Sequence, residues 1–390
     1  MKNRRLGLNA LFLWVGVVGA GLLSPSAILA QIRWQDLVLT GGLSAEGYRG
    51  NLPAATVSAV DCIEEAATSA LTCTKKASAV VGEMGLRGGL IFLNQPGRTL
   101  DLQVDAGLRQ FSTAGFKVRD YAPREWVGRA DLTYRTALES RGELFVQGGF
   151  AGRNVEERPP MPLFIQPGYS TVDGRVRLQF LPVGAAFLDA QVLGEVANYS
   201  ATALTPQLDL LDRKMIGLEA GMTWDRNWIL RVHTRVDLTE YDNQDTFDSD
   251  DPDRRDRSLN LGATWTLRSN VFVQLGVEGA VNRSNSSRPE YDALTLRAVV
   301  SMPLSQNLSA TFFANLTDKR YLTKTDFARL VPGEEADNAS VVYLELARPL
   351  MVNLDGAVRF GWTRAEEDIG KSYYERYGAT LLLRYRPWDQ

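Results

Sequence analysis

Histidine and cysteine are nearly absent from this 390-residue chain, which has one histidine, His233, and two cysteines, Cys62 and Cys73. Structural zinc sites need several Cys and His ligands, and serine hydrolases need a histidine base beside the nucleophile. The chain also lacks the G-x-S-x-G and H-E-x-x-H motifs and any glycine-rich phosphate loop. We therefore expect no cofactor and no metal site, and we expect that the protein is not an enzyme.

Lysine is scarce as well, and there is no excess of positive charge. Lys2, Arg4 and Arg5 are the only charged residues of positions 1–30, so residues 31–390 hold 40 of the 43 Lys and Arg residues, all 46 Asp and Glu residues and a net charge of −6. Only seven of those 40 cations are lysine. This charge balance argues against a nucleic-acid partner, because such proteins carry basic patches.

Long apolar runs are absent after the first thirty residues. The start has a basic segment, an apolar core from about Leu6 to Leu23 and small residues up to Ala30, which is the layout of a secretory signal peptide. We expect cleavage after Ala30 and a single domain over 31–390. In an exported protein, Cys62 and Cys73 are expected to form a disulfide across a short loop.

Alternation of apolar and polar residues is the dominant pattern, and helical periodicity is weak. Segments of about ten to sixteen residues alternate in this way and are separated by turn or loop residues, which predicts β-strands. The sixteen predicted strands are 34–48, 78–93, 99–111, 124–137, 141–152, 168–180, 185–199, 213–224, 227–241, 257–267, 270–283, 290–302, 306–318, 338–348, 351–364 and 372–386.

The connections between these strands alternate between short and long. Short ones such as "NQPGR", "LPVGA" and "PLSQ" take turns with longer polar ones such as "DNQDTFDSDDPDRRD". Short periplasmic turns and longer extracellular loops are typical of outer-membrane barrels, and an even number of strands places both ends on the short-turn side. The sequence therefore predicts an all-β fold, a single closed antiparallel transmembrane barrel of about sixteen strands in the outer membrane of a Gram-negative-type bacterium.

The last strand shows the two faces that such a barrel needs. In "YGATLLLRYRPW", Tyr377, Leu381 and Tyr385 lie on one face and Arg384 on the other. At about 3.3 Å per residue and a tilt of ~45°, this apolar stretch matches the membrane band, with aromatic rings at the interfaces. The predicted aromatic girdle comprises Trp126, Trp224, Trp228, Trp265, Trp362, Tyr377 and Tyr385.

The complementary face is rich in charge and is predicted to line the lumen. Its cations and its single histidine are Arg87, Arg109, Arg129, Arg135, Arg175, Arg177, Arg231, His233, Arg235, Arg297, Arg359, Arg376 and Arg384, and its acids are Glu83, Asp105, Asp131, Glu195, Glu219, Glu278, Glu345 and Asp355. Two interpretations compete: rows of arginine could guide a solute, or arginines and acids could pair across the wall. Counted over the whole of this face, alternation gives fourteen acids and thirteen arginines. These near-equal numbers favour pairing, because an anion-selective pore should carry an excess of arginine.

Three segments also resemble a known family. "LVLTGGLSAEGYRGNLPAA", followed by "GEMGLRGGLIFLNQPGRTLDLQVDAGLRQF", is similar to the β-barrel porin 2 type of outer-membrane protein, and the closing "SYYERYGATLLLRYRPW" resembles the last strand of that family. The resemblance implies an outer-membrane channel that is linked in many relatives to exopolysaccharide export. It implies no catalytic residues.

The function that we predict from the sequence is a porin-like channel with a charged lumen that passes small hydrophilic solutes or an exported polysaccharide. One alternative is a structural, assembly or adhesion barrel whose lumen is closed by Arg–carboxylate pairs. A second is a barrel enzyme with a serine–histidine pair facing lipid, although the alternation places His233 inward.

The expected partners are outer-membrane lipids and lipopolysaccharide, the barrel assembly machinery and, for polysaccharide export, a periplasmic partner docked on the short turns. The sequence leaves the solute and the oligomeric state open.

Overall fold

The computed structural model describes residues 33–50, 77–114, 124–139, 142–155, 168–180, 184–200, 211–242, 244, 253–286, 290–322, 340–367 and 372–387. The expected signal peptide and the expected Cys62–Cys73 disulfide lie outside these residues. The described residues contain no helix that is long and apolar enough to cross a membrane.

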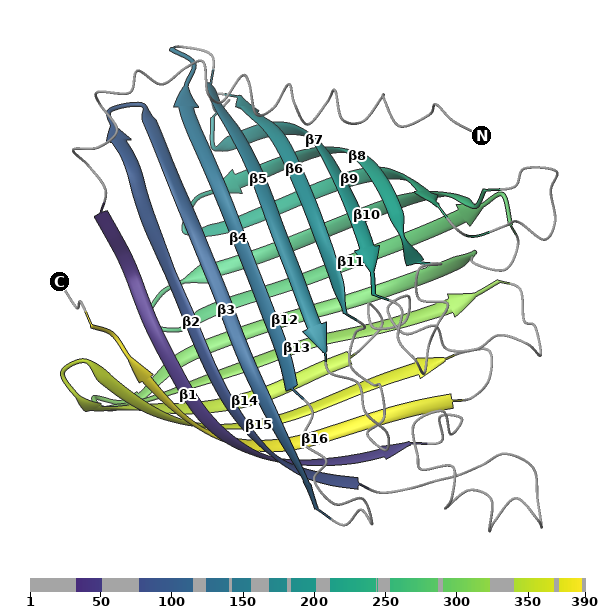
Figure 1. Cartoon of the computed structure of the whole chain (residues 1–390). Coiled ribbons are helices and arrows are strands. Elements are labelled where there is room, and N and C mark those ends of the chain that lie inside the picture. Colours follow the sequence, from purple (N-terminus) through teal and green to yellow (C-terminus); the bar gives the residue numbers. More distant parts are fainter. Residues whose placement is uncertain are drawn as a thin grey trace, which may run out of the picture.

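Sixteen antiparallel strands form one closed barrel (Figure 1). In chain order they are β1 (Arg33–Gly50), β2 (Ala77–Gln95), β3 (Arg98–Ala114), β4 (Arg124–Ala137), β5 (Gly142–Val155), β6 (Tyr169–Phe180), β7 (Ala186–Tyr199), β8 (Arg213–Asp225), β9 (Trp228–Tyr241), β10 (Arg255–Arg268), β11 (Phe272–Ser284), β12 (Tyr291–Ser305), β13 (Leu308–Tyr321), β14 (Ser340–Met351), β15 (Leu354–Glu367) and β16 (Ser372–Tyr385). Each strand was predicted, and no predicted end differs from the observed one by more than three residues.

The barrel closes where the first strand meets the last. Each strand pairs with its neighbours in sequence, and β1 pairs with β16, from Leu39 opposite Tyr385 to Gly50 opposite Tyr374. In Figure 1 the purple β1 and the yellow β16 lie side by side at this seam. Closure satisfies the backbone hydrogen bonds of both edge strands, which a sheet in lipid requires.

The two rims of the barrel differ in the length of their connections. The short ones join β2 to β3, β4 to β5, β6 to β7, β8 to β9, β10 to β11, β12 to β13 and β14 to β15, and β1 begins and β16 ends at the same rim. The turn between β2 and β3 holds Pro96 and Gly97, whose φ of +75° suits the third position of a type II turn. The strand ends that the longest connections join, such as those after β1, β5, β9 and β13, belong to the opposite rim, as predicted.

Alternation along each strand separates an outer from an inner face. Outer side chains are large, apolar and exposed, such as Met84 (68% exposed), Leu261 (61%) and Leu381 (61%). Side chains on the other face reach one another across an intervening strand, as Arg384 on β16 reaches Glu345 on β14. Such contacts require a concave surface, on which side chains converge, so this face is the inside of the barrel.

Candidate functional site: the inner wall

Cross-strand register assigns every predicted lumen residue to the inner face. Directly opposed residues of neighbouring strands share a face, and the pairs Glu83–Arg109 and Arg87–Asp105 connect β2 with β3 in this way. The same ladder of opposed positions continues around the barrel. The inner wall therefore holds the twelve predicted arginines, His233 and the eight predicted acids, and these residues form several clusters.

The first cluster centres on Arg109 of β3. Its guanidinium forms an ion pair with Glu46 of β1 and lies 3.8 Å from Glu83 of β2 and 3.6 Å from Glu125 of β4. Glu125 also accepts a 2.8 Å hydrogen bond from Nε of Arg153 on β5. Arg153 and Glu125 are only 5% and 6% exposed, so this network ties five strands together through buried charge.

A second cluster spans β4 to β6 across a glycine. Arg129 donates to Asp131 at 2.6 and 2.7 Å, and it lies 3.2 Å from Asp173 two strands away. Gly149 stands opposite both acids in the ladder, and a Cβ on Gly149 would lie 2.6 Å from an oxygen of Asp173 and 2.8 Å from one of Asp131. The missing side chain leaves the space that this ion pair crosses.

Neighbouring arginines on β4 and β6 contact an aromatic ring inside the barrel. The guanidinium carbons of Arg135 and Arg177 lie 5.2 and 5.3 Å from the ring centre of Phe145, within the range of cation–π attraction. Arg175 donates a 2.7 Å hydrogen bond to Gln147. These arginines are thus held mainly by neutral partners.

A third cluster joins β6 to β9. Arg231 donates to both oxygens of Asp189 at 2.9 Å and to Glu219 at 2.8 Å, while Arg177 lies 3.4 Å from Asp189. Gly221 lies between Asp189 and β9 in the ladder, and a Cβ on Gly221 would lie 2.9 Å from each of the Arg231 and Asp189 side chains. A glycine again allows an ion pair to cross a strand.

Polar residues of β7 to β10 continue the wall. Arg235 donates to Asp237 at 2.7 Å, and Arg213 lies 3.2 Å from Glu195. His233 faces inward opposite Gly221 and Gly262, and the imidazole occupies the space that a Cβ on Gly262 would need.

The last clusters lie on β11 to β16. Glu345 accepts hydrogen bonds from Arg359 at 2.7 and 3.0 Å and from Arg384 at 2.6 and 2.7 Å. Asp355 forms an ion pair with Arg386. Arg297 lies 4.0 Å from Glu278 and donates to Asn315, and Arg376 lies 3.5 Å from the hydroxyl of Thr363.

All of these pairs run along the wall. Among the described residues, no ion pair between inner side chains joins strands more than two places apart around the barrel. The pairs therefore reinforce the curvature of the sheet and do not connect opposite sides of the lumen.

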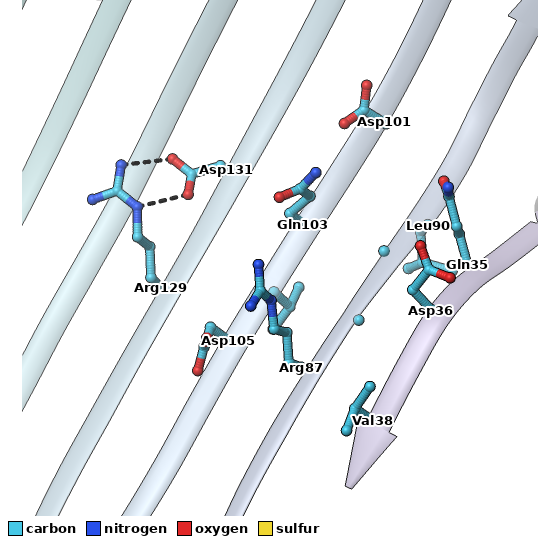
Figure 2. A pocket seen from close by; sticks show the side chains of 13 residues that line it. Gln35, Asp36, Val38, Arg87, Leu90, Asp101, Gln103, Asp105, Arg129 and Asp131 are labelled. Atoms are coloured by element: carbon cyan, nitrogen blue, oxygen red, sulfur yellow. Dashed lines mark hydrogen bonds and ion pairs between the residues drawn. The ribbon is translucent and has the colours of Figure 1, made fainter. Parts of the chain in front are cut away.

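A recess of about 430 Å³ opens in the inner wall over β1 to β4 (Figure 2). Arg87 of β2 and Asp101, Gln103 and Asp105 of β3 line it, and Asp36 of β1 borders it. Figure 2 shows the three β3 side chains in a row, with Arg87 beside Asp105. This is the place where the predicted residues Arg87 and Asp105 meet without forming an ion pair.

Several inner residues are not among the predicted ones, for identifiable reasons. Arg153 lies beyond the predicted end of its strand at 152. Glu125 has the parity of Arg129 but stands at the very start of β4. The β1 ladder shifts between Gln35 and Val38, where Asp36 has a φ of 51°, so strict alternation from Val38 would turn Gln35 outward, whereas Gln35 stands opposite Gly89 on the inner face. Inner aromatic pairs such as Phe313 and Tyr343, with ring centres 4.9 Å apart, also escaped notice.

The outer face carries the predicted aromatic girdle. All seven predicted residues have outward register, as shown by pairs such as Trp362–Tyr377, Trp224–Leu230 and Tyr385–Leu39. Trp224, Trp228, Trp265 and Tyr385 lie near the short-turn ends of their strands, and Trp126, Trp362 and Tyr377 near the long-loop ends. Rings at both edges of an apolar band are the pattern of a barrel in a bilayer. The protein is an outer-membrane β-barrel.

Comparisons with known proteins give fold-level similarity only. No family model and no curated protein matches the chain, so the resemblance to the porin 2 type family stays a prediction. Solved structures that resemble it include OpdQ of Pseudomonas aeruginosa (8% identity, 91% of this chain and 98% of that chain covered, TM-score 0.41). The outer-membrane channel DcaP of Acinetobacter baumannii has 12% identity, 92% and 98% coverage and a TM-score of 0.39. OmpF of Salmonella typhi, in complex with daunomycin, has 12% identity, 89% and 98% coverage and a TM-score of 0.40.

Proposed function

We propose that this barrel is an outer-membrane channel for small hydrophilic solutes. The observation that carries the proposal is a charged inner wall whose ion pairs lie along the wall of a sixteen-stranded barrel. Barrels of about eight strands are filled by their own side chains, whereas those of about sixteen to eighteen strands leave an aqueous channel. Water and polar solutes match a wall of guanidiniums and carboxylates better than any apolar cargo does.

The same geometry argues against a lumen closed by its own ion pairs. Closure would need arginines that reach acids on the opposite side of the barrel, and the inner pairs of the described residues reach the second strand at most. Arginines instead bind acids on nearby strands, as Arg231 binds both oxygens of Asp189. Paired charges also leave little net field, so we expect weak ion selectivity.

Single-channel recording in a planar bilayer tests the proposal. The refolded protein should give steady, ohmic conductance, with a small reversal potential under a salt gradient. Vesicles that contain the protein should swell in small sugars and progressively less in larger polyethylene glycols, which measures the bore. Heat-unfolded protein is the control. A folded barrel that is silent in both assays would contradict the channel and support a structural role.

A further inference from the structure

The recess on β1 to β4 differs from the rest of the inner wall because most of its polar groups have no partner. Arg87, Asp105 and Gln103 form no side-chain hydrogen bond or ion pair with any described residue, and all three are exposed to the lumen. Asp101 forms no ion pair with any described residue either. By contrast, Arg109, Arg231 and Glu345 are each held by two or more partners.

Backbone irregularities shape this recess. The ladder shift between Gln35 and Val38 brings Asp36 to its border, with a left-handed φ of 51°. Gly89 of β2 faces inward and lines the recess, and a Cβ on Gly89 would lie 3.5 Å from the backbone oxygen of Gln35. A bulge beside glycines re-aims side chains and is frequent next to functional sites in sheets.

Carboxylates outnumber cations around the cavity. Four aspartates line it, Asp36, Asp101, Asp105 and Asp131, against Arg87 and Arg129. Arg129 is already bound by Asp131, as the dashed lines in Figure 2 show. Arg135, the next cation beyond Asp101, lies over the ring of Phe145 and does not line the cavity. The free groups are thus three acids, one arginine and the amides of Gln35 and Gln103.

We propose that the recess is a binding site for small polar solutes that carry an ammonium group beside hydroxyl or carboxylate oxygens, such as an amino sugar. The ammonium lies against Asp101 and Asp105, where it supplies the positive charge that these acids lack. Neighbouring oxygens accept from Arg87 and from the amide of Gln103. Arg87 stands directly opposite Asp105 in the β2–β3 ladder, so one small molecule contacts both. The cavity of about 430 Å³ is within the ordinary range for small ligands.

Three hexoses of one ring size but different charge test this proposal: glucosamine at pH 6, glucose and glucuronate. Binding to the folded protein is measured by saturation-transfer nuclear magnetic resonance, which does not require conduction, and by solute-induced current noise in single channels. Glucosamine should bind best and glucuronate worst. The double variant Asp101→Asn with Asp105→Asn should weaken glucosamine binding about tenfold and leave glucose binding unchanged.

Glu278→Gln is the matched control, because it removes one lumen charge on β11, away from the recess. It should change glucosamine binding by less than about twofold. An equal loss in this control, or glucuronate binding as tight as that of glucosamine, would overturn the proposal.

The site depends on the proposed channel for its biological use, but the two can fail separately. Conduction without Asp101- and Asp105-dependent glucosamine binding would remove the site and keep the channel. Glucosamine binding that depends on these aspartates in a silent barrel would keep the site and remove the channel.

Discussion

At the scale of single residues, the inner wall depends on carboxylates that serve more than one arginine. Glu345 is 7% exposed and holds Arg359 and Arg384 from the two strands that follow it. Without its charge, two guanidiniums would face each other with no shared acceptor. Arginine suits this role better than lysine because its planar fork binds one carboxylate through two donors, which accounts for the scarcity of lysine in the chain.

We expect Glu345→Gln to lower the free energy of unfolding by about 1.5–3 kcal/mol, since hydrogen bonds to charged groups contribute this much. Urea unfolding in lipid vesicles, followed by tryptophan fluorescence, measures it. Glu278→Gln is the control, because the Glu278 carboxylate lies 4.0 Å from its arginine and is more exposed, and it should cost less than about 1 kcal/mol. Equal losses in the two variants would mean that the shared acceptor adds nothing.

Glycine has an equally local role where ion pairs cross a strand. Gly149→Ala places a methyl group against Asp131 and Asp173 and should destabilise the barrel by about 1–3 kcal/mol through overpacking. The adjacent Gly148 faces outward, with no atom within 4 Å of an added Cβ, so Gly148→Ala should be neutral or slightly stabilising. The same urea titration compares them, and a loss in Gly148→Ala as large as that in Gly149→Ala would contradict the role of Gly149.

At the scale of the strand, each strand faces lipid on one side and the aqueous lumen on the other, and this explains which features the sequence could predict. Lipid outside and water inside impose a period of two on every strand, so all sixteen strands and the faces of their side chains follow from alternation. Alternation does not specify how far a side chain reaches across the curved wall. It also fails at the β1 bulge, where Gln35 faces inward against the alternation of β1, and at the β5 end, where Arg153 lies past the predicted strand. The partners of each arginine therefore needed the three-dimensional structure.

The two faces of β10 give a direct test of this alternation. Leu261 is 61% exposed on the outer face, whereas the neighbouring Asn260 faces inward and donates to Asp237. Leu261→Arg should destabilise the inserted barrel by about 2–4 kcal/mol, because it places a charge in lipid. Asn260→Arg adds the same charge to the polar lumen beside Asp237 and should cost far less. Refolding equilibria in vesicles compare the two, and similar costs would mean that the assigned faces are wrong.

At the scale of the whole molecule, the two ends of the outer face differ. At the short-turn rim, β8, β9 and β10 carry the outward rings of Trp224, Trp228 and Trp265. At the long-loop rim, β8 to β13 carry outward charges. Those charges include the pairs Lys214–Asp242, Arg255–Glu240, Arg283–Asp292 and Arg320–Asp318. Arg257 stands directly opposite Arg283 and has no ion pair among the described residues. On β8 to β10, an apolar band with tryptophan rings at the short-turn end and ion pairs plus Arg257 at the long-loop end suits a bilayer whose outer leaflet is phosphorylated.

This polarity predicts that the lipopolysaccharide expected as a partner contacts Arg257 and Arg283 through its phosphates. Replacing both arginines by glutamine should weaken the binding of phosphorylated lipid A by about fivefold for each arginine and leave the binding of the dephosphorylated lipid unchanged. The shift of the unfolding temperature with added lipid measures this affinity. Arg348→Gln is the control, because Arg348 also faces outward but lies near the short-turn end of β14. If Arg348→Gln weakened binding as much, the phosphates would be held by diffuse positive charge, and the two ends of the barrel would not differ in their affinity for lipid.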